Sequence, residues 1–227
     1  MQNTEALALD IAQRLRDAMA QRGVAVLSVS GGKSPIALFE HLRKQVLDWR
    51  KVRITLVDER CVPTQHPDSN ALLVRTHLLQ DLAAHAQFFP MVMQDQAPLP
   101  SPQVLAQSAE ENLKQAGCAD VMVLGMGADG HTASLFPDAP NLQEALDLQN
   151  PHLCLPIELA NPPANAPFAR ITQTLAAIVS ARHLVLPIAG ADKLHTLNQA
   201  KQGIQMRLPI SYVLHQTQTP VALWITP

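Results

Sequence analysis

Cysteine is scarce in this sequence of 227 residues. The three cysteines, Cys61, Cys118 and Cys154, lie far apart, and none belongs to a CxxC pair. An odd number of widely separated thiols argues against a disulfide framework and against a cysteine-rich zinc site. We therefore expect buried or idle thiols in a reducing compartment.

Long apolar runs are missing as well. No stretch of about 18 apolar residues occurs that could cross a membrane as a helix. The N-terminus, "MQNTEALALDIAQRL", lacks the basic start and apolar core of a signal peptide. We expect a cytoplasmic protein with no membrane partner.

An excess of positive charge is the third absence. The formal net charge is -2 at pH 7, which gives no reason to expect a nucleic-acid partner, since such partners usually need a basic face. A small anionic ligand is compatible with this charge, because it needs only a few local positive groups. The hydrophobic content of 47% is typical of globular proteins.

Short apolar runs alternate with stretches of helical periodicity. The runs at 24–30, 52–58 and 120–127 suit strands that are buried on both faces, as in parallel sheets. Later strands are expected at 170–174, 183–190 and 221–226, and helices at 4–22, 35–46, 71–79, 101–116 and 191–202. The alternation predicts an α/β fold with a mainly parallel sheet.

Prolines cluster at 90–102 and at 151–167. Strands that look like core elements lie on both sides of each cluster, so we interpret the clusters as surface loops and not as linkers. Residues 1–227 are therefore predicted to form a single domain.

The segment "SVSGGKSP", from Ser28 to Pro35, looks like the end of an ATP-binding P-loop. The pattern GxxxxGK[ST] requires a glycine where this chain has Leu27, and Pro35 follows where the P-loop helix should already be running. A nucleotide P-loop is therefore disfavoured. What remains is a glycine-rich turn before a proline-started helix, which can cradle a phosphate through backbone N–H groups. An ordinary tight turn explains the same residues equally well.

A second motif, "GMGADG" at 125–130, matches the dinucleotide pattern GxGxxG after a predicted strand. A dinucleotide site would continue into a long helix and then a second strand that ends in an acidic residue. Pro137 closes the segment almost at once, and no strand is expected near 145–150. The motif therefore gives little support to a nucleotide cofactor.

Polar loops at 30–34, 58–70 and 127–137 follow the three predicted parallel strands. Ligands of open α/β sheets bind beyond the carboxyl ends of the strands, so these loops are predicted to meet around one pocket. His131 is the natural general base, because histidine is the residue type suited to proton transfer near neutral pH. Asp129, two residues earlier, would orient that imidazole or touch the substrate.

Three motifs in order, "SGGKSP", "VDERCVPTQHPDSN" and "GMGADGHTASLFP", resemble those of the 6-phosphogluconolactonases, relatives of the glucosamine-6-phosphate deaminases and isomerases. The resemblance continues through Arg170 and Lys193. It implies a Rossmann-like, doubly wound α/β fold with helices on both faces of the sheet. It also implies hydrolysis of 6-phospho-D-glucono-1,5-lactone in the pentose phosphate pathway. No metal or organic cofactor is implied, in agreement with the absence of HExxH and CxxC motifs.

The motifs assign roles to particular residues, and for Arg170 and Lys193 the resemblance alone implies the role. His131 and Asp129 would be catalytic. The substrate-binding residues would be Gly31, Gly32, Lys33, Ser34, Asp58, Arg60, Asn70, Gly127, Arg170 and Lys193. Asp58 and Asn70 would shape the pocket or bind sugar hydroxyls, and Arg60 would serve the carbonyl or the phosphate. Lys33 stands where many relatives have arginine, serine or threonine, so the backbone amides of its loop are expected to matter more.

Three other functions fit the residues less well. The related deaminases and isomerases typically continue as "HIAFNEP", with a glutamate that helps to open the sugar ring, whereas this chain has "HTASLFP" with Phe136 in that place. A sugar-phosphate sensor usually carries a helix-turn-helix and a basic surface, and no such basic segment is found here. A serine hydrolase would need GxSxG, but Ser30 lies between Ser28 and Gly32.

Assembly and loop motion are less constrained by the residues. We expect a monomer or a weak homodimer, with a small sugar-phosphate lactone as its partner. The proline-rich loop at 161–167 lies just before Arg170, so we hypothesise that it closes over the pocket.

Overall fold

Helix α1 (Gln2–Arg22) opens the fold. The structure is a computed structural model and describes residues 2–159 and 167–226. Leu7, Ile11 and Leu15 recur at helical spacing along α1 and are buried, so one face of the helix packs on the sheet. Gly23 has a φ of 80°, which lets the chain leave the helix and enter the first strand.

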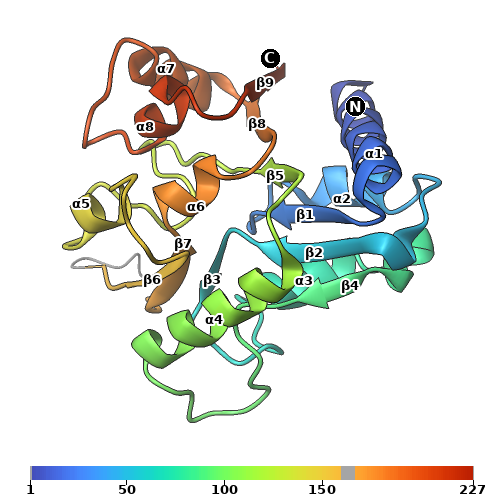
Figure 1. The fold of residues 1–227 in the computed structure, drawn as a ribbon. Helices are drawn as coiled ribbons and strands as arrows, with labels where there is room; N and C mark the ends of the chain where they lie inside the picture. The colour runs from blue at the N-terminus through green and yellow to red at the C-terminus, as the bar shows by residue number, and fades with distance from the viewer. Residues whose placement is uncertain (1, 160–166, 227) are drawn as a thin grey trace.

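Within the described residues, six parallel strands form the central sheet (Figure 1). In spatial order they are β4 (Gln87–Phe89), β2 (Val52–Leu56), β1 (Ala25–Val29), β5 (Val121–Val123), β8 (Leu184–Ala189) and β9 (Val221–Thr226). Every neighbouring pair is parallel, so the predicted mainly parallel α/β fold is confirmed. The chain adds β2 and β4 on one side of β1 and then returns to add β5 on the other. Sheets of this kind bind ligands beyond the carboxyl ends of the strands at such a reversal.

A second, antiparallel sheet contains β3 (Asp58–Arg60), β7 (Arg170–Gln173) and β6 (Cys154–Ile157), in that spatial order. The strand expected at 170–174 exists, but it belongs to this small sheet. The interpretation of all of 151–167 as surface loop is wrong at β6, whose Cys154 and Ile157 are buried. Pro156 argued against a strand at this place, because prolines are rare in strands except at sheet edges, where a missing N–H is tolerated.

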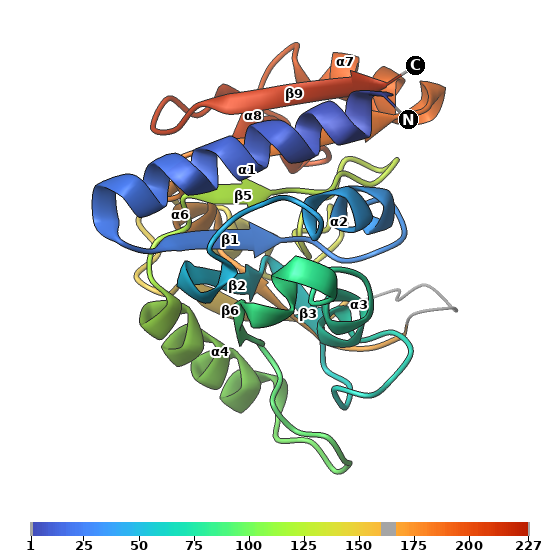
Figure 2. The same cartoon turned by 90° about the vertical axis from the view of Figure 1, so that its right-hand side faces the viewer.

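Helices cover both faces of the central sheet, as Figures 1 and 2 show. After α1 they are α2 (Ile36–Leu42), α3 (Asn70–His77), α4 (Pro102–Ala116), α5 (Leu142–Ala145), α6 (Leu175–Val179), α7 (Ala191–Ala200) and α8 (Ile210–His215), with 3-10 turns at Trp49–Lys51 and Asp81–His85. Helices α1 and α2 pack together on one face, and α4 packs with β6 and β7 on the other. The expected doubly wound arrangement is confirmed, although α2 ends four residues before position 46.

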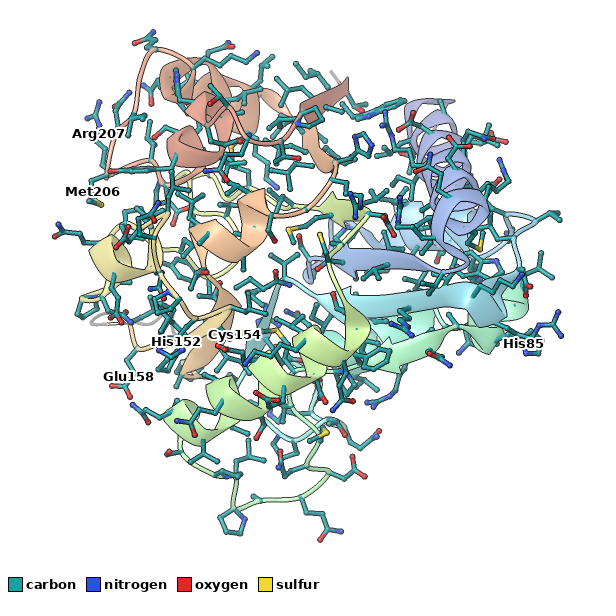
Figure 3. The ribbon with its side chains drawn as sticks, in the orientation of Figure 1. His85, His152, Cys154, Glu158, Met206 and Arg207 are labelled. Atoms are coloured by element: carbon teal, nitrogen blue, oxygen red, sulfur yellow. The ribbon has the colours of Figure 1, made fainter. Side chains whose placement is uncertain are left out.

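The small sheet is attached to α4 by polar contacts as well as by packing. The Leu153 backbone N–H donates to Glu110 Oε2 at 3.0 Å, and His152 Nδ1 lies 3.5 Å from the same oxygen. Figure 3 shows His152 and Cys154 beside α4. These contacts fix in place the sheet that carries Arg170.

Two expectations about the whole chain have different outcomes. Along the part of the chain that the structure describes, no helix is both long and apolar enough to cross a membrane. That residues 1–227 form a single domain stays a prediction. The hypothesis of a lid at 161–167 falls on residues that, apart from Pro167, lie outside the described ones.

Candidate active site

One cavity lies beyond the carboxyl ends of β1 and β5, where the strand order reverses. Its volume is about 250 Å³. The expected residues that line it are Gly31, Gly32, Ser34, Asp58, Arg60, Asn70, Gly127, His131, Arg170 and Lys193. Two expected residues, Lys33 and Asp129, do not line it. Lys33 is exposed to solvent, and the Asp129 carboxylate is hydrogen-bonded to His131.

His131 and Asp129 form a hydrogen-bonded pair in the loop after β5. Asp129 Oδ1 lies 2.5 Å from His131 Nδ1 and accepts the His131 backbone N–H at 3.1 Å. Burial raises the pKa of Asp129, but the hydrogen bonds and charge of His131 outweigh it and hold that pKa below its ordinary value. An ionised carboxylate can only accept hydrogen bonds, so Nδ1 carries a proton, and in the neutral form of the imidazole Nε2 is then the acceptor. With a neutral imidazole, such a pair is able to accept a proton at Nε2.

Two glycines make this turn possible. A Cβ on Gly127 would lie 2.2 Å from His131 Nδ1, so the imidazole can fold back over the loop only at a glycine. Gly130 has a φ of 80°, and a Cβ there would lie 2.7 Å from Leu208 Cδ2. The glycines of "GMGADG" therefore shape the histidine turn.

Asp58 and Asn70 join the segment after β2 to the rest of the site. Ser134 donates its hydroxyl to Asp58 Oδ2 at 2.6 Å, and Asn70 Nδ2 donates to the Asp58 backbone oxygen at 2.8 Å. Gly31 comes so close that a Cβ on it would lie 1.8 Å from Asn70 Oδ1. Gly31 was expected to let the backbone approach a ligand, and it also lets the backbone approach Asn70. Sequence reasoning missed Ser134, because its partner is 76 positions away.

Arg60 and Arg170 lie opposite one another on neighbouring strands. Their Cα atoms are paired between β3 and β7, where like charges repel. Within the described residues, the Nε atoms of both guanidinium groups are buried and find no hydrogen-bond partner. Burial lowers the pKa of Arg170, the charge of Asp58 opposes this, and the charge of Arg60 adds to it. Two cations with unused donors in one cavity indicate an anionic ligand.

Lys193 and Ser34 bring a further cation to the cavity. Lys193 lies in the first turn of α7, and its Nζ lies 3.4 Å from Ser34 Oγ. Gly32, in the same loop as Ser34, has a φ of 85°. A cation beside a turn of backbone N–H groups suits a phosphate.

Phe136 contacts both the base and a guanidinium group. The centroids of the Phe136 and His131 rings are 4.3 Å apart, and Arg170 Cζ lies 5.1 Å from the Phe136 centroid. Ala133, between the two rings in sequence, turns the chain with a φ of 51°. These contacts were not predicted, because spacing alone cannot show which rings meet.

Metal-binding side chains do not gather in this way. Among the residues with described positions, no three histidine, cysteine, aspartate or glutamate side chains are grouped so that they could hold a metal ion. That the reaction needs no metal and no organic cofactor stays a prediction.

Comparison with known proteins identifies the family. The sequence model described as "Glucosamine-6-phosphate isomerases/6-phosphogluconolactonase" matches residues 2–224. The chain belongs to this family. The resemblance carried by the three motifs is therefore confirmed.

Relatives in this family match almost the whole chain. A Pseudomonas putida protein named 6-phosphogluconolactonase is 43% identical over 210 residues, which cover 92% of this chain and 84% of that protein. A Rhizobium meliloti protein of the same name is 41% identical over 224 residues, covering 98% of this chain and 94% of that protein. The crystal structure of a 6-phosphogluconolactonase from Shewanella baltica matches with a TM-score of 0.89 at 39% identity, over 99% of this chain and 93% of that one.

Proposed function

We propose that this chain hydrolyses 6-phospho-D-glucono-1,5-lactone to 6-phospho-D-gluconate, the second step of the oxidative pentose phosphate pathway. Its family relatives at 41% and 43% identity are named 6-phosphogluconolactonase. The observation that carries the proposal is one cavity lined by a histidine that a carboxylate orients, two arginines with unused donors, and a lysine. A base beside an anion site is what the hydrolysis of a phosphorylated lactone requires.

The reaction is acyl transfer to water, with His131 as general base. Nε2 takes a proton from water while the water oxygen attacks the lactone carbonyl carbon, whose oxygen becomes an oxyanion. On collapse, the bond from that carbon to the ring oxygen breaks, and the imidazolium gives its proton to the ring oxygen. The carboxylic acid that forms then ionises. Asp129 holds the imidazole and stabilises its positive charge between the two steps.

The phosphate is assigned to the Gly31–Ser34 loop together with basic residues. The loop offers backbone N–H groups beside Lys193 Nζ, and Arg60 and Arg170 offer guanidinium groups. Arginine can grip a phosphate with two parallel hydrogen bonds, whereas lysine acts as a point charge. Asp58 and Asn70 line the same cavity and would bind sugar hydroxyls or keep its shape.

Deamination or isomerisation of an amino-sugar phosphate is the alternative within the family. That chemistry typically uses a glutamate in the place of Phe136. The centroid of the Phe136 ring lies 4.3 Å from that of the His131 ring, and a phenyl side chain cannot act as an acid or a base. This contact favours the lactonase reaction.

Lactone disappearance tests the proposal. The lactone is generated in place by enzymatic oxidation of glucose 6-phosphate, and its decay is followed by NMR in the presence of a chelator. Wild type, His131→Ala and a blank without the protein run side by side, with circular dichroism to check folding. We expect fast decay with wild type and decay near the blank with His131→Ala. Decay no faster than the blank with folded wild type would refute the proposal, and amino-sugar phosphates would be tested next.

A further inference from the structure

Glu59 is a buried carboxyl group that the proposed mechanism does not use. It lies on β3 between Asp58 and Arg60, which both line the cavity. Its exposed fraction is 0%. A carboxyl group held away from water in this way is costly unless its partners compensate, so the partners show what it does.

Four donors converge on the two carboxylate oxygens of Glu59. Oε1 accepts the backbone N–H groups of Arg60 and Asn70, each at 2.8 Å. Oε2 accepts the backbone N–H of Ala71 at 2.7 Å and the hydroxyl of Ser69 at 3.2 Å. Burial raises the pKa of Glu59 to about 7, although these backbone hydrogen bonds oppose the shift.

These hydrogen bonds fix two residues whose side chains line the cavity. Asn70 is the first residue of α3, so Glu59 holds the N-terminus of that helix against β3. The Asn70 side chain reaches the Asp58 backbone oxygen and lies against Gly31. Arg60 follows Glu59 directly, and its own N–H is one of the four donors. Loosening one carboxyl group would therefore shift both Asn70 and Arg60.

We propose that Glu59 is a positioning residue for substrate binding, which sets Asn70 and Arg60 at the separation that the sugar-phosphate lactone needs. The inference rests on the proposed lactonase function and adds to it a residue behind the cavity wall. Glu59 acts on the binding groups and not on His131, so its substitution changes substrate affinity more than the chemical step.

Glu59→Gln tests this role, because it replaces one acceptor oxygen with an NH2 group at almost unchanged shape. We expect the KM for the lactone to rise about tenfold, with kcat within about twofold of wild type. The dissociation constant of 6-phosphogluconate, measured by calorimetry, rises by a similar factor. Asp120→Asn is the matched control: it alters another buried carboxylate, far from the cavity, and leaves KM unchanged.

A double-mutant cycle with Asn70→Ala distinguishes a positioning role of Glu59 from a general loss of protein stability. Glu59→Gln has a smaller effect on KM in the Asn70→Ala background, since effects within one hydrogen-bond network are not additive. An equal effect in both backgrounds, or lowered stability with an unchanged KM, would overturn the inference. If Glu59→Gln does not fold, Glu59→Asp keeps the charge on a shorter side chain and gives the same readouts. A wild type without lactonase activity would instead refute the proposed function.

Discussion

Buried charge is arranged differently at the two ends of the parallel strands. We call the end where the strands begin the amino edge and the end where they finish the carboxyl edge. At the amino edge, Asp120 is buried and pairs with Arg22 and with Arg182, whose Nε lies 3.2 Å from it. At the carboxyl edge, in the described part of the chain, Arg60 and Arg170 keep buried Nε atoms without hydrogen-bond partners. Both edges bring two arginines together, but among the described residues only the arginines at the amino edge form an ion pair with a carboxylate.

This difference separates charges that stabilise the fold from charges that are left for a ligand. At the amino edge the charges compensate one another inside the protein. At the carboxyl edge the unused donors cost folding free energy, and an anionic ligand would offset that cost. Two arginines with unused buried donors in one cavity are therefore a better mark of the site than the number of charged residues.

The largest expected contrast comes from neutralising one aspartate at each edge. Asp129→Asn removes the carboxylate that keeps the His131 proton on Nδ1, so kcat should fall about 100-fold or more. Asp120→Asn should leave kcat unchanged and lower the free energy of unfolding by about 1–3 kcal/mol, because its buried donors lose a charged acceptor. Steady-state kinetics and urea unfolding measure the two effects. A loss of kcat in Asp120→Asn would contradict the division between the edges.

The pH dependence of stability extends the comparison to Glu59, whose hydrogen-bond partners among the described residues are three backbone N–H groups and a hydroxyl, without an arginine side chain. Its pKa is raised by burial from 4.5 to about 7 on folding. The folded state binds this proton more tightly, so the stabilisation is complete below about pH 4.5 and is lost as the pH rises through about 7. The stability of wild type relative to Glu59→Gln should fall by about 3 kcal/mol across this window. Urea unfolding at several pH values measures it, and a constant difference would argue against the shift.

A smaller effect is expected from removing one arginine at each edge. Arg170→Leu deletes a buried guanidinium group with unused donors, so KM should rise about 20-fold, as expected for a lost hydrogen bond to a charged group. Arg182→Leu removes an exposed arginine that already has Asp120 as its partner, so KM should stay the same. Initial rates over a range of lactone concentrations give both values. Equal KM values for the two variants would show that unused donors do not mark the site.

Local patterns predicted the scaffold and the contact between His131 and Asp129. The runs at 24–30, 52–58 and 120–127 correspond to β1, β2 and β5, because strands buried on both faces are continuously apolar. The His131 and Asp129 pair could be predicted because both residues belong to one short turn. Such signals depend on neighbours in the sequence, which a single chain displays directly.

Contacts between distant segments could not be predicted in the same way. The segment of strand β3 was expected to be a loop, because three charged residues in a row are not typical of a strand. It is a strand because it pairs with β7, which is distant in the sequence. The role of Glu59 depends on the start of α3, and that of Ser134 on Asp58, and neither partner is marked by spacing. Lys33 is exposed and does not line the cavity, and its role in substrate binding stays a prediction.

The pairing of β3 with β7 also bears on how the chain folds. Arg170 reaches the cavity only when β7 has paired with β3, and Gln173 on β7 donates to the Leu56 oxygen at the end of β2 at 2.8 Å. Pairings that close a long loop carry a larger entropic cost than local contacts and slow the search for the native state. A partly refolded molecule with an intact parallel sheet but an undocked β7 would have native-like helicity and an incomplete cavity. Recovery of enzymatic activity would therefore report the docking of β7, which recovery of helicity does not.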